Sequence, residues 1–272
     1  MTLVRTPSVA GLFYPADAGS LAAEVQAHLR AAAPRDVAAH GDLRGLVVPH
    51  AGYVYSGPVA GVAYHVLAPI ASSVEQVLLL GPPHRVPVRG LQVTAAQRWS
   101  TPVGELTVDA AGRRALVAAA ASRGRPDLVG VGDTAHAGEH SLEVQVPFLL
   151  ATVPEAAVLP VLVGDGDPAV LADLITGWWG DGRLIVVSTD LSHYEPHAAA
   201  VRHDERTSRA IVAADASAIG DRDACGARAL RVLLTLAERH RATVVELDRR
   251  TSADTAGTPD RVVGYGAFAV VP

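Results

Sequence analysis

Four segments of the sequence place a histidine close after an apolar run or close before a run that favours a helix. The segments are 47–50, 80–84, 138–141 and 190–193, and they contain His50, His84, His140 and His193. Imidazole is the commonest side-chain metal ligand and also titrates near neutral pH, so these residues can bind a metal or move a proton. The single cysteine, Cys225, precedes another helix-forming run. We therefore expect one metal site or reactive centre assembled from distant parts of the chain.

Three of these histidines follow apolar runs that read as buried strands: His50 after 46–48, His84 after 77–80 and His193 after 184–187. Open α/β sheets form their binding crevices beyond the carboxyl ends of such strands. A lone histidine at a loop edge is more often a hydrogen-bonded turn residue than a ligand. Because the same local setting recurs, we expect at least two of the three to share one site.

Cys225 lies just before the helix-forming run 227–239. The positive end of a helix dipole lowers the pKa of a nearby thiol, which predicts a thiolate at this position. The alternative is a small buried apolar residue without a chemical role. Two imidazoles and a thiolate suit iron(II), zinc or copper and leave a position for substrate, and the sequence spacing does not choose among these metals.

Two acidic residues accompany the histidines. Asp190 lies three residues before His193, where it can accept an imidazole N–H or the proton of a metal-bound water. Glu139 precedes His140 at the start of an expected helix, where a carboxylate is also favoured simply because it complements the helix dipole. For Glu139, the structural and the functional interpretations both stay open.

Strand-like and helix-like segments alternate along the chain, which predicts an α/β domain with a central, mostly parallel or mixed sheet covered by helices. The expected strands are 43–48, 74–80, 91–95, 158–163, 184–188, 243–248 and 263–270. The expected helices run from Asp17 or Ser20 to about Ala33, and over 108–122, 141–150, 168–178, 197–214 and 226–239. Segments 122–138 and 251–260 read as surface loops, and neither reads as a linker. We expect a single domain over residues 1–272.

Composition narrows the class of protein. Of the 272 residues, 49% are hydrophobic, and the net charge is −5, so the chain can bury a large core and offers no basic field to nucleic acid. A single cysteine excludes an internal disulfide, which suits a reducing compartment. The first residues lack a signal-peptide pattern, and three prolines interrupt the longest apolar stretch, 146–163. We expect a cytoplasmic protein that binds neither nucleic acid nor a membrane.

Seven short motifs follow one another along nearly the whole chain. They are 10–15 (AGLFYP), 49–57 (PHAGYVYSG), 80–84 (LGPPH), 101–104 (TPVG), 139–143 (EHSLE), 160–164 (PVLVG) and 188–193 (STDLSH). In this order they resemble the Memo family, which includes the bacterial proteins called AmmeMemoRadiSam system protein B. That family is similar in fold to the class III extradiol dioxygenases, so the resemblance implies a LigB-like α/β domain.

By this resemblance, His50 and His84 correspond to two metal-binding histidines and Cys225 to the third ligand. The dioxygenases instead use two histidines and a carboxylate, which leave open positions for catechol and O₂. A thiolate is softer, more electron-donating and more easily oxidised, so ring-cleaving activity is not implied. The resemblance implies a metal-binding protein with a redox or oxygenase-like role, with iron (Fe²⁺) as the expected metal and copper or zinc as alternatives.

The same resemblance assigns proton transfer to the remaining pocket residues. His193 corresponds to the acid/base histidine of the dioxygenases, Asp190 lies beside it, and His140 matches a further pocket histidine. These three are the expected catalytic residues. The small-molecule or peptide ligand is unknown, and the family context implies radical-SAM and AMMECR1-like partner proteins.

Two other functions fit the same residues. The pocket could serve a non-catalytic adaptor module that binds a peptide around 53–55 or sequesters metal. Alternatively, Cys225 could be the nucleophile of a hydrolase, activated by His193, but that reaction needs an oxyanion hole that the sequence does not identify. Whether the protein is an enzyme therefore stays open.

Overall fold

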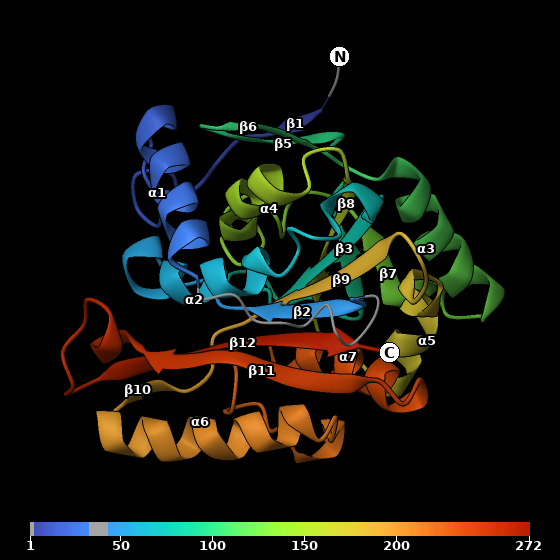
Figure 1. The fold of residues 1–272 in the computed structure, drawn as a ribbon. Helices are drawn as coiled ribbons and strands as arrows, with labels where there is room; N and C mark the ends of the chain where they lie inside the picture. Colours follow the sequence, from blue (N-terminus) through green and yellow to red (C-terminus); the bar gives the residue numbers. More distant parts are fainter. Residues whose placement is uncertain (1–2, 33–42) are drawn as a thin grey trace.

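A mixed β-sheet forms the centre of the computed structural model, which describes residues 3–32 and 43–272 (Figure 1). Its strands are β2 (Gly45–Val48), β3 (Gln76–Gly81), β4 (Leu91–Val93), β7 (Val129–Val131), β8 (Ala157–Val163), β9 (Arg183–Ser188), β10 (His193–Glu195), β11 (Thr243–Thr251) and β12 (Val262–Val271). They lie in the order β10-β12-β2-β9-β3-β8-β4-β7, and β11 also pairs with β12. A separate small sheet contains β1 (Val4–Arg5), β5 (Arg98–Thr101) and β6 (Gly104–Thr107).

The four central strands β2, β9, β3 and β8 run parallel, and almost all of their residues are buried. Strands covered on both faces need such continuous apolar runs. Val48 pairs with Ser188 across β2 and β9, and Leu80 pairs with Val187 across β3 and β9. The carboxyl ends of these three strands therefore lie at one edge of the sheet. At the margins, β4 is antiparallel to β8 and β12 to β2, which makes the sheet mixed.

Helices cover both faces of the sheet. They are α1 (Ala18–Ala31), α2 (Tyr53–His65), α3 (Ala110–Ser122), α4 (Val146–Thr152), α5 (Pro168–Ile175), α6 (His197–Val212) and α7 (Ala227–Arg239). Figure 1 shows α1, α2 and α4 on one side and α6 on the other. Helix α2 packs against α1, α4 and the sheet, α7 packs against α5 and β9, and α6 packs against β11 and β12. Within the described segments, no helix is long and apolar enough to cross a membrane.

Aspartate side chains cap the starts of three helices. Asp17, Asp109 and Asp167 each accept a hydrogen bond from a main-chain amide in the first turn of α1, α3 and α5. A side-chain oxygen at this position satisfies an amide that has no partner within the helix. The first expected helix therefore starts after Asp17 rather than at Ser20, and its expected end at Ala33 lies outside the described residues.

All seven expected strands are present, with ends shifted by three residues or fewer. The helix expected over 141–150 is wrong at its start, because a 3₁₀ turn at Glu143–Gln145 precedes α4. Proline is favoured in the first turn of an α-helix, where its missing N–H is not needed, so Pro147 suits a helix that starts at Val146. The expected loop 122–138 also contains β7 and the fully buried His136.

Helix α2 is absent from the sequence-based prediction. It contains Pro58 and two glycines, all weak helix formers, and it is apolar on every side, so it has no amphipathic period. Tertiary packing explains the glycines. A Cβ on Gly57 would lie 2.3 Å from the His28 ring, and one on Gly61 would lie 2.5 Å from the His28 main-chain oxygen. These glycines let α1 cross close to α2.

Candidate metal centre

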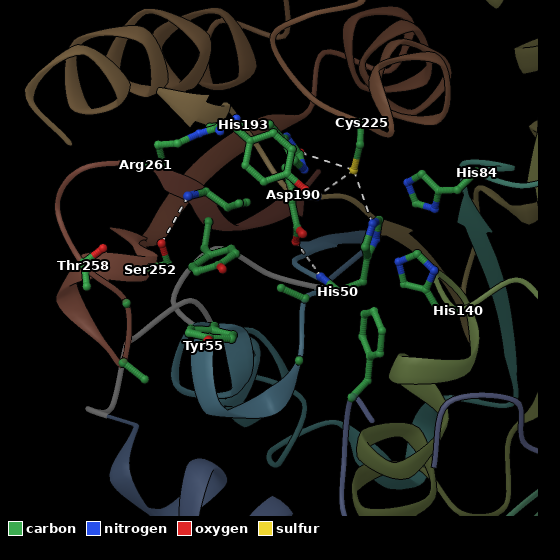
Figure 2. Close-up of a pocket in the computed structure, with 18 residues that line it drawn as sticks. His50, Tyr55, His84, His140, Asp190, His193, Cys225, Ser252, Thr258 and Arg261 are labelled. Atoms are coloured by element: carbon green, nitrogen blue, oxygen red, sulfur yellow. Dashed lines mark hydrogen bonds between the residues drawn. The ribbon is translucent and has the colours of Figure 1, made fainter. Parts of the chain in front are cut away.

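One pocket of about 860 Å³ is lined by all six residues that the sequence predicts as metal ligands or catalytic residues (Figure 2). They are His50, His84, His140, Asp190, His193 and Cys225. The segments after β2, β3 and β9 supply four of them, because these strands end at one edge of the sheet. The other two come from the segment before α4 and the segment before α7. Residues up to 175 positions apart in the chain thus face one cavity.

The hydrogen bonds of Ser188 determine the tautomer of His50. The Ser188 hydroxyl has one proton, which it donates to the Ser141 carbonyl oxygen at 2.6 Å. Its oxygen accepts from Gln145 Nε2 at 2.8 Å, and Nδ1 of His50 lies 3.0 Å away. Nδ1 must therefore carry the proton of the neutral ring and donate it to Ser188. This leaves the lone pair of His50 Nε2 free on the pocket side.

Glu139 orients the other two imidazoles. Its Oε2 accepts the main-chain N–H of His84 at 2.5 Å, and its Oε1 accepts Nδ1–H of the same ring at 2.9 Å. Oε1 also accepts the main-chain N–H groups of His140 and Ser141, each at 2.9 Å, and lies 3.3 Å from His140 Nδ1. Burial would raise the pKa of Glu139, but the hydrogen bonds from His84 and Ser141 outweigh it and lower the pKa to about 2. A carboxylate that holds Nδ1 leaves Nε2 free to bind a metal.

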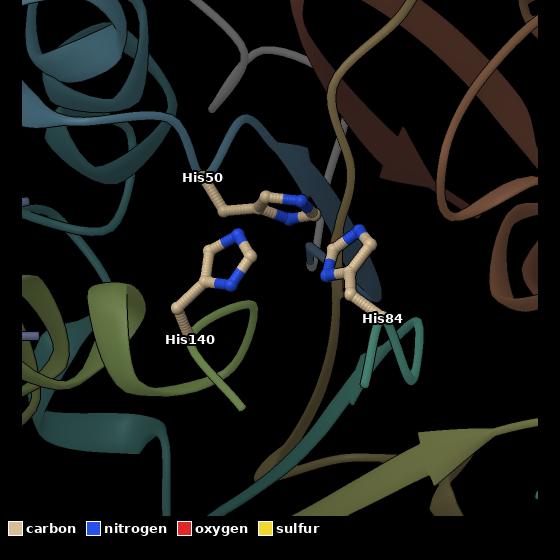
Figure 3. A group of neighbouring side chains, drawn as sticks. All are labelled: His50, His84 and His140. Carbon is tan, nitrogen blue, oxygen red and sulfur yellow. The ribbon is translucent and has the colours of Figure 1, made fainter. Parts of the chain in front are cut away.

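The three imidazoles converge, as Figure 3 shows. One ligand atom from each of His50, His84 and His140 lies within 4.8 Å of the others, and this is the one such group in the part of the chain that the structure describes. The rings of His84 and His140 stack with centroids 4.7 Å apart. Burial lowers the pKa of His140 to about 4, and burial together with the two neighbouring rings lowers the pKa of His50. Neutral imidazoles keep the lone pairs that a metal needs.

A buried arginine holds the segment that carries Glu139 and His140. Arg5 donates from Nε to the His136 carbonyl oxygen at 2.9 Å and from Nη2 to the Glu139 carbonyl oxygen at 2.7 Å. Its Nη1 pairs with Glu143 at 2.8 Å, and both side chains are almost completely buried. Residues from the start of the chain therefore fix the backbone of the site.

Cys225 lies next to the histidine group without belonging to it. Its Sγ is 3.2 Å from His50 Nε2 and 3.3 Å from the main-chain N of Asp190. Burial, and then the charge of Asp190, raise the pKa of this thiol to about 12. Gly226 is the N-cap of α7, so the thiol lies near a helix start as expected. The expected lowered pKa is nevertheless wrong, because desolvation outweighs the effect of the helix dipole. Without a bound metal the thiol is protonated and donates to His50 Nε2.

His193 and Asp190 lie in the pocket as expected, with different hydrogen-bond partners. His193 Nδ1 donates to the Leu191 carbonyl oxygen at 2.8 Å, so its Nε2 keeps a lone pair. Asp190 Oδ1 accepts the main-chain N–H of His50 at 2.7 Å rather than an imidazole N–H. Burial raises the pKa of Asp190 to about 6, against the lowering effect of the bond from His50. The group can therefore exchange a proton near neutral pH.

Aromatic and polar side chains form the rest of the pocket wall. Tyr55, Tyr194 and Tyr265 line it, as does the connection between β11 and β12 (Figure 2). The guanidinium of Arg261 lies 5.3 Å from the Tyr194 ring centroid. Arg261 is the one arginine among the lining residues, so an anionic group of a ligand would be favoured on its side of the pocket.

Two residues orient the ligands, and sequence reasoning missed one of them, Ser188. Ser188 looked like the end of a buried strand, and the strand pairing of Ser188 with Val48, two residues before His50, was not available from the sequence. Glu139 was recognised with its role left open: it accepts two main-chain amides ahead of a 3₁₀ turn rather than at the start of a helix, and it also accepts Nδ1–H of His84. The adjacent pair Glu139-His140 was the one signal in the sequence.

The residues present fit a transition metal. The available donors are neutral imidazole nitrogens and one thiol, which suit iron(II), zinc or copper and are a poor set for magnesium or calcium. Carboxylate and hydroxyl groups hold the Nδ1 atoms of His84 and His50, as in established metal sites. The hydrolase alternative is weaker, because the imidazole that contacts Cys225 is His50 and the thiol pKa is raised.

Comparisons with known proteins place nearly the whole chain in one family. The Memo-like protein family matches residues 5–269. MEMO1 family proteins of Ignicoccus hospitalis and Methanopyrus kandleri are both 33% identical to this chain, with 97% of the chain and 98% of each relative covered. A MEMO1 family protein of Desulfurococcus amylolyticus is 30% identical with the same coverage. The chain therefore belongs to the Memo-like protein family.

Proposed function

We propose that this chain is a mononuclear metal-binding protein with a redox or oxygenase-like role. The observation that carries the proposal is the convergence of His50, His84 and His140, whose ligand atoms lie within 4.8 Å of one another. The Nδ1 atoms of His50 and His84 are engaged by Ser188 and Glu139, so their Nε2 atoms are left for the metal. Iron(II) is the metal we expect, with copper or zinc as alternatives.

Two residues compete for the third ligand position. Cys225 is our choice, because its Sγ lies 3.2 Å from the donor atom of His50 and because a thiolate favours redox-active metals. Its raised pKa does not oppose this, since a metal displaces the thiol proton on binding. His140 is the alternative, supported by its place in the histidine group.

The other pocket residues suit proton transfer. When bound, the metal would supply electron transfer and activation of O₂ or a substrate. The free Nε2 of His193 can accept a proton from a ligand in the cavity, because its Nδ1–H is engaged by Leu191. Asp190, with a pKa of about 6, can hold or release a proton beside it.

Metal analysis tests the proposal directly. Protein purified without oxygen is expected to contain close to one iron or copper per chain, and the His50→Ala and His84→Ala variants are expected to lose it. His65→Ala is the control, since His65 lies at the end of α2 and does not line the pocket. Equal, negligible metal in the native protein and in all of these variants would refute the proposal.

Cobalt substitution separates the two third ligands. A thiolate bound to cobalt(II) gives a strong charge-transfer band in the near ultraviolet, and an imidazole does not. We expect this band in the native protein and in His140→Ala, and its loss in Cys225→Ser. A cobalt-loaded native protein without the band would exclude Cys225 and leave the three-histidine site.

A second function has one observation in its favour. Val54 and Tyr55, at the start of α2, are exposed, and Tyr55 also lines the pocket, which suits an adaptor that binds a peptide. Tyr53 does not take part in such a surface, because it is buried and donates to the Val144 carbonyl oxygen. Partnership with radical-SAM and AMMECR1-like proteins stays a prediction that co-purification would test.

A further inference from the structure

Another histidine-carboxylate group is made of residues that do not line the pocket. His203, on α6, contacts Glu195 Oε1 through Nδ1 at 2.8 Å and Asp223 Oδ1 through Nε2 at 2.7 Å. Both partners are carboxylates, which only accept hydrogen bonds. Both ring nitrogens must therefore carry a proton and donate it, which makes the ring an imidazolium. Burial lowers the pKa of His203, but the hydrogen bonds and charges of Asp223 and Glu195 outweigh it and raise the pKa overall.

Each of the two carboxylates lies in a chain segment that also carries a pocket residue. Glu195 lies two residues after His193 on β10, and Asp223 lies two residues before Cys225. Asp223 also accepts the main-chain N–H of Gly220 at 2.7 Å, which closes the turn that leads to Cys225. The imidazolium therefore joins residues 192–195, the His193 segment, to residues 220–225, the Cys225 segment.

The His193 segment needs such a restraint. Strand β10 pairs with β12 through two residues only, and the register is interrupted between them. The interrupting residue, Tyr194, has a φ of 60°, in the left-handed region that disfavours side chains, and its side chain is 64% exposed. A strained residue persists only where its surroundings determine its conformation. Glu195, the residue after Tyr194, supplies such a restraint through its hydrogen bond with His203.

The charges around His203 agree with a cationic ring. Glu195 of β10 and Asp223 of the Cys225 segment contact it, and Asp204, its neighbour on α6, adds a third carboxyl group. From β11, the positive charge of Arg249 acts on Asp204. Asp204 accepts the main-chain N–H of Ser192 at 3.0 Å, so α6 holds the His193 segment at two points.

We propose that His203 is a positioning residue that ties the His193 segment to the Cys225 segment and thereby sets the separation of these two side chains across the pocket. The significance of that separation rests on the proposed function, in which both residues serve one metal centre. The hydrogen bonds of His203 with Glu195 and Asp223 do not involve a metal, so this connection is testable without one.

Alkylation of Cys225 by iodoacetamide provides the test. Cys225 is the only cysteine, so the reaction reports one site in the full chain after treatment with a chelator. Removing a charge-assisted hydrogen bond makes local opening of its segment easier, so His203→Gln is expected to react about tenfold faster than the native protein at one fixed pH. Arg209→Gln is the control, because it breaks only an exposed ion pair with Glu205 on the same helix.

The decisive variant is Glu195→Gln. Glu195 binds His203 and, among the described residues, forms no hydrogen bond or ion pair with the Cys225 segment. If His203 connects the two segments, loss of the Glu195 charge should nevertheless accelerate alkylation of Cys225, by about as much as Asp223→Asn. Circular dichroism and thermal melting confirm that each variant is folded. A rate within about twofold of native in folded Glu195→Gln would refute the tie. Native protein that binds no metal would refute the proposed function and leave this result unaffected.

Nitrogen chemical shifts of the histidine rings give a second, independent measurement. We expect both ring nitrogens of His203 to be protonated at neutral pH, and one of them to lose its proton more readily in Asp223→Asn. A neutral His203 ring in the native protein at neutral pH would contradict the proposal.

Discussion

Glu139 accepts both the main-chain N–H and the Nδ1–H of His84, at 2.5 and 2.9 Å. One carboxylate therefore fixes both the position of a candidate metal ligand and the tautomer of its ring. The same group accepts the main-chain N–H groups of His140 and Ser141. Two of the three converging imidazoles thus depend on one side chain that does not itself line the pocket.

Replacing Glu139 by glutamine is expected to weaken metal binding about 10- to 100-fold, the usual effect of removing a carboxylate that holds a metal-bound histidine. Competition with a chelator of known affinity measures this. Glu155→Gln is the matched control, since Glu155 is exposed and does not line the pocket. Unchanged affinity in Glu139→Gln would mean that Glu139 serves only as a backbone cap.

The Arg5–Glu143 pair predicts a large effect on stability. Both side chains are at most 4% exposed, and Glu143 also accepts from Ser8, Val9 and the Tyr14 hydroxyl. Glu143→Gln removes the negative charge and leaves the Arg5 cation buried without its partner, which costs about 3–5 kcal/mol. Urea denaturation measures the change in the free energy of unfolding.

The exposed pair Arg98–Glu105 supplies the control for that measurement. Because water screens both charges, Glu105→Gln is expected to change the free energy of unfolding by about 0–1 kcal/mol. A cost for Glu143→Gln as small as that of Glu105→Gln would show that the buried network relaxes around a missing charge.

The sequence predicts the parallel centre of this fold because its strands are continuous apolar runs, and predicts the pocket because the histidines follow those strands. It does not predict α2, since helix formation there depends on close packing against His28 rather than on local preference. The predicted direction of the pKa shift of the Cys225 thiol was wrong for a related reason. A helix terminus is visible in sequence, whereas the burial that outweighs its dipole is a property of the folded chain.

The crossing of α1 and α2 makes Gly61 hard to replace. Alanine has the higher helix propensity, by about 1 kcal/mol, so an isolated helix would gain stability from Gly61→Ala. Here the new Cβ would lie 2.5 Å from the His28 main-chain oxygen, which belongs to a helix and cannot turn away. We expect a net destabilisation of about 1–3 kcal/mol by thermal or urea unfolding. Gly177→Ala, where no atom lies within 4 Å of the new Cβ, is the control and is expected to be nearly neutral.

The pH dependence of stability follows from the raised pKa of His203. The folded state binds this proton more tightly than the unfolded state, so the stabilisation is fully present below the unfolded value of about 6.5. It is lost as the pH rises through the higher pKa of the folded state. The difference in unfolding free energy between native protein and His203→Gln should therefore be largest in mild acid and should shrink as the pH rises above neutral.

Measuring the difference between two proteins is necessary because another histidine has the opposite effect. Burial lowers the pKa of His136 to about 4, so the unfolded state binds that proton first and the native protein loses stability as the pH falls from about 6.5. Since His136 is present in both proteins, its contribution cancels in the comparison. Urea denaturation over a pH series measures both curves. A difference that stays constant with pH, or that grows toward alkaline pH, would mean that His203 is not the proton-binding group between Glu195 and Asp223.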